Sequence, residues 1–301
     1  MHIIGHQKIR ERLKKRAGQS AGSQAFLFHG PSGIGKSLAA LEFAARLASQ
    51  PDFLPTPDLP SPTDVLVVRP EQETKKGVTK QKRIGVETLR EALTFLSRFP
   101  ASGRYRVLII EAAEMLSLAA ANALLKNLEE PNATSVIILV SSHKGRLLPT
   151  LLSRVEKFRF AFLPEEEMKE AFTDGCRKEE DPAFVQFLFS LGRPGLLVRA
   201  QADPEFFSAT REKLGKLFRL SRLSLPARLQ LAEELSLNVP ATAETLEWWL
   251  PGLHTLAFRH AATGKARFFS YLEEVEETLF LLRTTQANAR LLLEKLFLSL
   301  P

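Results

Sequence analysis

The sequence of 301 residues contains a single cysteine, Cys176. One cysteine cannot form an intramolecular disulfide, and it cannot build the paired-cysteine sites that hold structural zinc. No apolar run approaches the roughly 20 residues of a membrane-spanning helix. The first residues also lack the basic stretch and apolar stretch of a secretory signal peptide. These absences predict a cytoplasmic protein that binds no zinc and has no membrane partner.

The chain has no strong excess of one charge. Lys and Arg number 41 against 34 Asp and Glu, which gives a formal net charge of +7. This modest basic excess is compatible with a nucleic-acid partner, but many proteins that never contact DNA carry as much. The length exceeds that of one ordinary hydrophobic core and predicts two or three domains.

The first half of the chain alternates short apolar runs with amphipathic segments. The apolar runs predict buried strands at residues 25–29, 65–68, 105–110 and 135–140. Helical spacing predicts helices at residues 9–17, 36–48, 86–99 and 117–130. Short buried strands separated by helices predict a parallel sheet covered on both faces. After about residue 160 only helical periods follow, which predicts a small helical lid and a helical C-terminal domain.

Two segments between these elements lack periodicity. Residues 51–62 are rich in proline and predict a loop. Residues 69–83 are polar and contain six basic side chains, Arg69, Lys75, Lys76, Lys80, Lys82 and Arg83. We expect an exposed loop there, whose basic side chains are either solvated or in contact with DNA.

A phosphate-binding pattern follows the first predicted strand. The pattern G-x-x-x-x-G-K-[ST] is matched in full by Gly30, Pro31, Ser32, Gly33, Ile34, Gly35, Lys36 and Ser37. Its place between a strand and a helix is the context that the pattern requires. Backbone N–H groups of the loop and of the first helical turn, through Leu38, are expected to bind phosphate. Lys36 is expected to reach the β- and γ-phosphates, and the Ser37 hydroxyl to ligate Mg²⁺. The segment predicts a site for ATP or ADP; the alternative is a structural turn that keeps the pattern without binding.

The acidic side of the predicted site is altered. P-loop ATPases of this kind usually place Asp and Glu after a neighbouring strand, where this sequence has Glu111 and Ala112. Glu111 is one methylene longer than Asp and is expected to hold Mg²⁺ weakly. Alanine cannot activate water, and loss of a general base typically slows a reaction by a factor of about 10² to 10⁴. Glu114, three residues further on, is a less favoured substitute. The pattern predicts nucleotide binding without efficient turnover.

Several segments resemble bacterial clamp-loader subunits of the AAA+ class. The most specific are the run N-A-L-L-K-N-L-E-E-P at residues 122–131 and the run L-L-P-T-L-L-S-R-V at residues 147–155. Residues 3–6 and 288–296 resemble the start and the end of the same family. The resemblance implies a P-loop AAA+ parallel-sheet domain over residues 1–160, a helical lid over 161–203, and an all-helical collar for oligomerisation over 204–301.

Departures from the motor subunit of that family indicate the delta-prime type. Glu111 and Ala112 replace Asp and Glu, and Gly195 stands where the motor subunit carries an arginine. The zinc-binding cysteines that usually follow the P-loop helix are missing. The resemblance implies gamma/tau and delta subunits, the sliding clamp and primer-template DNA as partners. The alternatives are an ATP-hydrolysing gamma/tau-like motor, which the intact Lys36 and Ser37 favour, and an unrelated P-loop enzyme such as a nucleotide kinase.

Arg154 is the residue for which the resemblance implies a catalytic role in trans. In the family this arginine lies at the subunit boundary and enters the nucleotide site of the neighbouring subunit. Such arginine fingers raise rates by about 10³ to 10⁵. The alternative is an ordinary salt bridge. Elsewhere, one of Ser141, Ser142 and His143 either faces the nucleotide or caps a strand end, and the basic helix at residues 9–17 either follows DNA or is a solvated face.

Overall fold

The computed structural model describes most of the chain. The described residues are 3–18, 24–48, 63–75, 78–101, 104–172, 192–203, 205, 208, 212, 215, 220, 223–243, 245–246, 249–250, 253, 265–284 and 287–299. Two compact units make up the chain: Met1–Ala171 with Gly192–Gly195, and Phe172–Leu191 with Leu196–Pro301. The three domains predicted from the sequence, with boundaries at residues 160 and 203, stay a prediction. The predicted loop at residues 51–62 lies outside the described residues.

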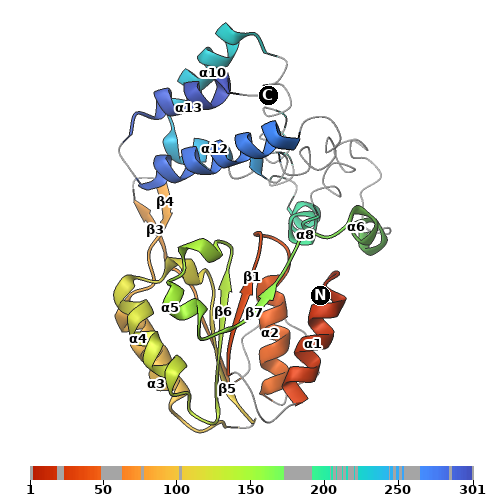
Figure 1. Ribbon diagram of the computed structural model, residues 1–301, viewed down its shortest axis with the longest axis vertical. Coiled ribbons are helices and arrows are strands. Elements are labelled where there is room, and N and C mark those ends of the chain that lie inside the picture. Colours follow the sequence, from red (N-terminus) through yellow and green to blue (C-terminus); the bar gives the residue numbers. More distant parts are fainter. Residues whose placement is uncertain are drawn as a thin grey trace. The chain divides into compact units, whose positions relative to one another are not determined.

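A five-stranded parallel sheet forms the centre of the first unit, in the order β2–β5–β6–β1–β7 (Figure 1). The strands are β1 (Ala25–His29), β2 (Val65–Val68), β5 (Arg106–Ile110), β6 (Ser135–Ser141) and β7 (Glu156–Arg159). The first four confirm the predicted strands to within one residue at each end. The edge strand β7 was not predicted, because its sequence Glu-Lys-Phe-Arg offers one apolar side chain, Phe158, to the core.

Helices cover both faces of this sheet, as the pattern predicted (Figure 1). On one face lie α1 (Gln7–Gly18) and α2 (Lys36–Leu47). On the other face lie α3 (Val86–Leu96), α4 (Leu118–Glu129) and the short α5 (Pro149–Leu152). Ser117 explains where α4 begins, since its hydroxyl accepts a hydrogen bond of 3.1 Å from the N–H of Ala120.

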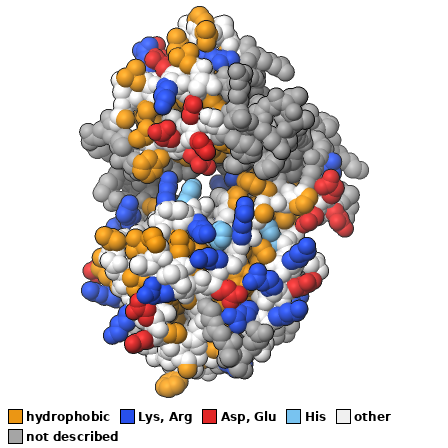
Figure 2. All heavy atoms as spheres, in the orientation of Figure 1, with side chains coloured by type: hydrophobic (Ala, Val, Ile, Leu, Met, Phe, Trp, Pro, Cys, Tyr) orange, Lys and Arg blue, Asp and Glu red, His pale blue; other side chains and the backbone are white. Residues whose placement is uncertain are grey.

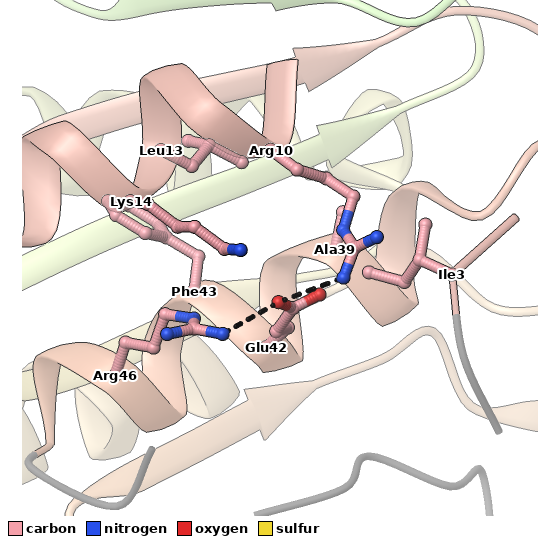
Figure 3. Close-up of a pocket in the computed structure, with 8 residues that line it drawn as sticks. All are labelled: Ile3, Arg10, Leu13, Lys14, Ala39, Glu42, Phe43 and Arg46. Atoms are coloured by element: carbon pink, nitrogen blue, oxygen red, sulfur yellow. Dashed lines mark hydrogen bonds and ion pairs between the residues drawn. The ribbon is translucent and has the colours of Figure 1, made fainter. Parts of the chain in front are cut away.

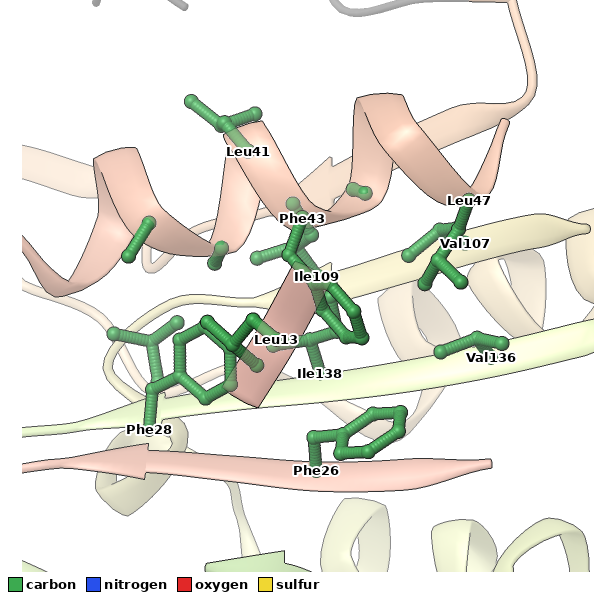
Figure 4. Close-up of a cluster of buried hydrophobic side chains, with 14 of the residues drawn as sticks. Leu13, Phe26, Phe28, Leu41, Phe43, Leu47, Val107, Ile109, Val136 and Ile138 are labelled. Atoms are coloured by element: carbon green, nitrogen blue, oxygen red, sulfur yellow. The ribbon is translucent and has the colours of Figure 1, made fainter. Parts of the chain in front are cut away.

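The strands send alternate side chains into two cores, as the two-residue period of a strand requires. Phe26 and Phe28 of β1 lie in the core under α2, whereas Leu27 lies in the core under α3 and α4. Figure 4 shows Phe43 of α2 reaching down toward these strands, and its ring packs edge-on against Phe26 with centroids 5.1 Å apart. This packing holds β1 and α2 together, and it therefore positions the loop that joins them.

Charged side chains join α1 to α2. Arg10 of α1 and Arg46 of α2 reach Glu42 from opposite sides, at N–O distances of 3.4 and 3.1 Å (Figure 3). The cavity beside them measures about 10 Å³. That is barely the space for one water molecule, so this cluster is a helix contact and not a ligand site.

The predicted basic helix is α1, and Figure 2 shows Lys and Arg side chains over its region of the surface, with acidic side chains among them. Arg16 pairs with Glu156 of β7 at 2.7 Å, and the guanidinium of Arg12 lies 4.7 Å from the centre of the Phe158 ring. Part of the basic helix therefore packs against its own chain. Contact of its remaining lysines with DNA stays a prediction.

The segment predicted as an exposed loop at residues 69–83 contains a hairpin instead. Strands β3 (Gln72–Lys75) and β4 (Val78–Gln81) pair antiparallel, with Glu73 opposite Lys80. The prediction was wrong here because the segment has neither the apolar run nor the apolar alternation that is the usual strand signal of a sequence. Backbone pairing between the two arms does not need that signal.

Helices alone make up the described part of the second unit. Its described helices include α10 (Leu225–Ser236), α12 (Lys265–Thr284) and α13 (Ala289–Leu298). Trp249 is fully buried in its core, and its ring centroid lies 5.8 Å from that of Phe297. Along the sequence, α6 (Glu165–Phe172) and α8 (Pro194–Ala202) lie where the chain passes between the units. No helix in the part of the chain that the structure describes is long and apolar enough to cross a membrane.

Candidate nucleotide-binding site

The phosphate loop joins β1 to α2, as its sequence pattern predicted. Three glycines of the loop have positive φ angles, which residues with a side chain rarely adopt. The angles are +145° at Gly30, +76° at Gly33 and +91° at Gly35. A Cβ atom at Gly30 would lie 2.1 Å from the carbonyl oxygen of Phe160. These three positions therefore require glycine. The loop ends at the first turn of α2, whose N–H groups have no partner within the helix and are suited to an anion.

Lys36 is buried inside this loop. Its Nζ donates hydrogen bonds to the carbonyl oxygens of Gly30 (2.7 Å) and Pro31 (2.6 Å), and to the hydroxyl of Ser142 (3.2 Å). Burial lowers the pKa of Lys36 to about 8; the carboxylate of Glu114 opposes this shift and Arg193 adds to it. The ammonium group is thus held at the bottom of the loop, where a bound phosphate would favour its charged form.

An open pocket of about 420 Å³ lies over the loop. This volume falls within the range of about 300–1,000 Å³ that is typical of small-molecule sites. Its lining residues are Ser32, Gly33, Gly35, Lys36, Ser37, Leu38, Arg69, Pro70, Glu111, Ala112, Val140, Ser142 and Gly195. Three residues of the predicted loop do not line the pocket. The carbonyl oxygens of Gly30 and Pro31 accept hydrogen bonds from Lys36. Ile34 is buried, and its carbonyl oxygen accepts a hydrogen bond of 3.1 Å from His6.

Among the described residues that line the pocket, Glu111 is the one with a carboxylate. It is paired with an arginine. Nε of Arg69 donates to Oε2 of Glu111 at 3.0 Å, and Nη2 donates to Oε1 at 3.5 Å. Mg²⁺ is the metal that the loop sequence implies, with Ser37 and Glu111 as its expected partners. Since both oxygens of Glu111 accept from a guanidinium, the acidic side of the pocket does not fit that metal. The described residues contain no cluster of three His, Cys, Asp or Glu that could hold a metal ion.

Glu114 is engaged elsewhere and is unsuited to replace the missing base. Its Oε1 accepts a hydrogen bond from the N–H of Ser142 (3.1 Å) and pairs with Nδ1 of His143 (3.4 Å). Burial alone would raise the pKa of Glu114, but hydrogen bonds from His143, Ser141 and Ser142 outweigh burial and lower the pKa to about 2. A general base works best with a pKa near the working pH. Glu114 instead holds the end of β6 in place.

Two further residues complete the pocket. Of the three polar residues at the end of β6, Ser142 faces the loop through its contact with Lys36, whereas Ser141 is buried and bonds to the N–H of His143. Gly195 approaches from α8, and its N–H donates a hydrogen bond of 2.9 Å to the carbonyl of Gly33. No place in this pocket was predicted for Arg69, because nothing in the sequence shows that the ends of β2 and β5 are neighbours.

Arg154 lies outside this pocket, just after α5. Its Nη1 donates to the carbonyl of Thr150 (3.0 Å) and to the hydroxyl of Ser153 (3.1 Å), and its Nη2 pairs with Glu129 at 2.6 Å. The structure thus separates Arg154 from the phosphate loop of its own chain.

The parallel sheet, the strand–loop–helix that carries the phosphate-loop pattern and the helical second unit define a P-loop protein of the AAA+ class. Two solved structures share this fold at a TM-score of 0.50. One is a DNA polymerase III gamma subunit-related protein from Thermotoga maritima, with 20% identity over 96% of this chain and 97% of that one. The other is a variant of RuvB from the same organism, with 18% identity over 85% and 89%. At these identities the likeness shows the fold alone.

The family follows from the sequence of the first unit. Residues 5–164 match the family described as "DNA polymerase III, delta subunit", and the chain belongs to this family of clamp-loader subunits. It is 34% identical over 150 residues to the DNA polymerase III subunit delta' of Pseudomonas aeruginosa, covering 46% of this chain and 43% of that protein. It is 29% identical over 158 residues to DNA polymerase III subunit tau of Bacillus subtilis, covering 52% and 28%. The chain therefore matches less than half the length of these relatives.

Proposed function

We propose that this chain is the delta-prime type subunit of a bacterial DNA polymerase III clamp loader, and that it hydrolyses ATP poorly or not at all. The family match and the 34% identical delta' relative support the type of subunit. One observation supports the proposed lack of ATP turnover. Ala112 lines the pocket at the position where a water-activating carboxylate is expected in an ATPase. Glu114, the nearest substitute, is held at the end of β6 with a pKa of about 2.

In this proposal the chain assembles with gamma/tau and delta subunits. The assembly places the sliding clamp on primer-template DNA, and this subunit contributes structure instead of ATP turnover. Its phosphate loop holds ATP or ADP statically. The intact Lys36 and Ser37 favour the second candidate, an ATP-hydrolysing gamma/tau-like motor, and the experiment below separates the two.

The proposal gives Arg154 a role in the nucleotide site of a neighbouring subunit. Its side chain is 34% exposed, and its partner Glu129 is 51% exposed. Such exposed ion pairs stabilise a protein by about 1 kcal/mol at most, so a neighbour's phosphate groups can replace Glu129 at little cost. The planar guanidinium binds phosphate oxygens in pairs and stabilises the charge that develops during phosphoryl transfer.

The test compares ATP turnover by the purified chain alone with turnover by the assembled clamp loader on primed DNA. We expect the chain alone to be silent. Arg154→Ala is expected to lower the DNA-stimulated turnover of the assembly without preventing assembly, which size-exclusion chromatography checks. Arg90→Ala is the matched control, because Arg90 is an exposed arginine on α3. Turnover by the chain alone that Lys36→Ala abolishes would instead identify a motor subunit.

A further inference from the structure

The Arg69–Glu111 pair is built into the backbone of the sheet. Strands β2 and β5 are parallel neighbours with Val68 opposite Ile110, and the N–H of Glu111 donates a hydrogen bond of 2.9 Å to the carbonyl of Val68. The residues that follow the two strands, Arg69 and Glu111, are therefore adjacent at the edge of the sheet. Both line the phosphate-loop pocket. Strand register therefore brings the two residues within reach of each other, and their side chains form the pair.

This pair occupies the place where P-loop ATPases hold their metal. A carboxylate at the end of the neighbouring strand normally binds Mg²⁺ through water. Here both oxygens of Glu111 accept hydrogen bonds from the guanidinium of Arg69. Arginine stays protonated across the working pH range, so the positive charge beside Glu111 is permanent. A hydrated dication would have to displace this guanidinium and then lie close to it.

The guanidinium itself can do what the metal does for a bound phosphate. The side chain of Arg69 is 52% exposed, whereas that of Glu111 is 19% exposed, so the arginine retains N–H groups that face the open pocket. Guanidinium N–H groups form short, charge-assisted hydrogen bonds with phosphate oxygens. Lys36 lies at the floor of the same pocket, and the hydroxyls of Ser32, Ser37 and Ser142 line it. Together these groups form an anion site with two cationic side chains and no need of a metal.

We propose that this pocket binds a nucleoside di- or triphosphate without Mg²⁺, and that Arg69, oriented by Glu111, replaces the metal as cationic partner of the terminal phosphates. The inference rests on nucleotide binding by the phosphate loop, which is part of the proposed function. It assigns a binding role to Arg69 and a positioning role to Glu111. Replacement of the metal by Arg69 also fits a subunit that does not hydrolyse ATP. A fixed guanidinium binds phosphate but does not supply the metal-bound water molecules of an ATPase.

The test measures the affinity of the full-length chain for fluorescently labelled ADP, once in EDTA and once in excess Mg²⁺. We expect the wild type to bind in both, with affinities within a factor of about three. In EDTA, Arg69→Gln is expected to bind about tenfold more weakly, as is typical when one charge-assisted hydrogen-bonding group is lost. Adding Mg²⁺ should restore part of the affinity of Arg69→Gln, because Glu111 is then free to hold the metal. Arg90→Gln serves as the control and should bind as the wild type does.

Three results would overturn the inference. The first is a wild type whose affinity falls more than tenfold in EDTA. The second is Arg69→Gln binding in EDTA as tightly as the wild type, with thermal unfolding confirming that the variant is folded. The third is absence of ADP binding under both conditions. The third result would also refute the static nucleotide of the proposed function, whereas the first two leave that proposal intact. The role as a delta-prime type subunit is tested separately, because the effect of Arg154→Ala on the assembled clamp loader does not depend on occupancy of this pocket.

Discussion

The N–H of Gly195 donates a hydrogen bond of 2.9 Å to the carbonyl oxygen of Gly33, in the middle of the phosphate loop. A Cβ atom at Gly195 would lie 2.8 Å from that same oxygen. The backbone of Gly195 therefore lies against the loop, at the sequence position where the family resemblance places an arginine in a motor subunit. A larger residue at this position has to move the loop.

Replacing Gly195 with alanine is expected to disturb the loop. The added methyl group collides with backbone that cannot rotate away, and overpacking of this kind costs about 1–3 kcal/mol of the free energy of unfolding. We expect weaker binding of labelled ADP and lower stability in urea titrations. Gly145→Ala is the matched control, because nothing lies within 4 Å of a Cβ atom at Gly145. Equal effects of both substitutions would show that the contact between Gly195 and Gly33 does not matter.

Nucleotide affinity should depend on the protonation of Lys36. Its pKa is lowered to about 8 in the free protein, chiefly by burial. A bound phosphate favours the ammonium form, so binding at higher pH requires uptake of a proton. We expect the affinity for labelled ADP to be nearly constant from pH 6.5 to 7.5 and to fall above pH 8, by up to about tenfold per pH unit. A flat profile up to pH 9.5 would contradict the buried position of this lysine.

Glu114 should stabilise the fold in a pH-dependent way. Its pKa is lowered from 4.5 to about 2 in the folded chain. The stabilisation is therefore complete above pH 4.5 and is lost as the pH falls through about 2. We expect Glu114→Gln to lower the free energy of unfolding at pH 7 by about 2–3 kcal/mol, and the difference from the wild type to narrow below pH 4.5. Urea titrations at pH 7, 4 and 3 measure this, with Glu91→Gln, an exposed α3 carboxyl, as the control.

Ala112 lies in the left-handed region of backbone space, with φ +48° and ψ +50°. A Cβ atom there approaches the following carbonyl oxygen, at a cost of roughly 1–2 kcal/mol that glycine avoids. Glycine at this position would gain stability by avoiding that cost, but its greater freedom in the unfolded chain offsets part of the gain. We expect Ala112→Gly to raise the free energy of unfolding by up to about 1 kcal/mol. The neighbouring Ala113→Gly should lower it, since Ala113 is buried in a right-handed turn and its methyl group packs in the core. A loss of stability in both variants would contradict the strain at Ala112.

Much of the first unit is determined by local sequence. The strands β1, β2, β5 and β6 are continuous apolar runs, because a parallel sheet covered by helices is buried on both faces. The phosphate loop is equally local, since its glycines, Lys36 and the first turn of α2 follow one another along the chain. The strands that were not predicted, β7 and the two arms of the β3–β4 hairpin, consist mainly of polar residues. Their hydrogen bonds are made by the backbone, which carries no sequence signal.

The character of the pocket depends on contacts between residues that are distant in sequence. The sequence shows Glu111 and Ala112 in place of Asp and Glu, and from this alone a weak magnesium site is a fair prediction. Arg69 lies 42 residues away from Glu111 and meets it only because β2 and β5 are neighbours in register. In the same way, the folded chain brings Gly195 to Gly33 and turns Glu114 toward the end of β6. The sequence by itself determined the phosphate loop and its missing base. Only the tertiary structure decided which cation lies beside Glu111 in the pocket, because strand order joins residues that no local pattern connects.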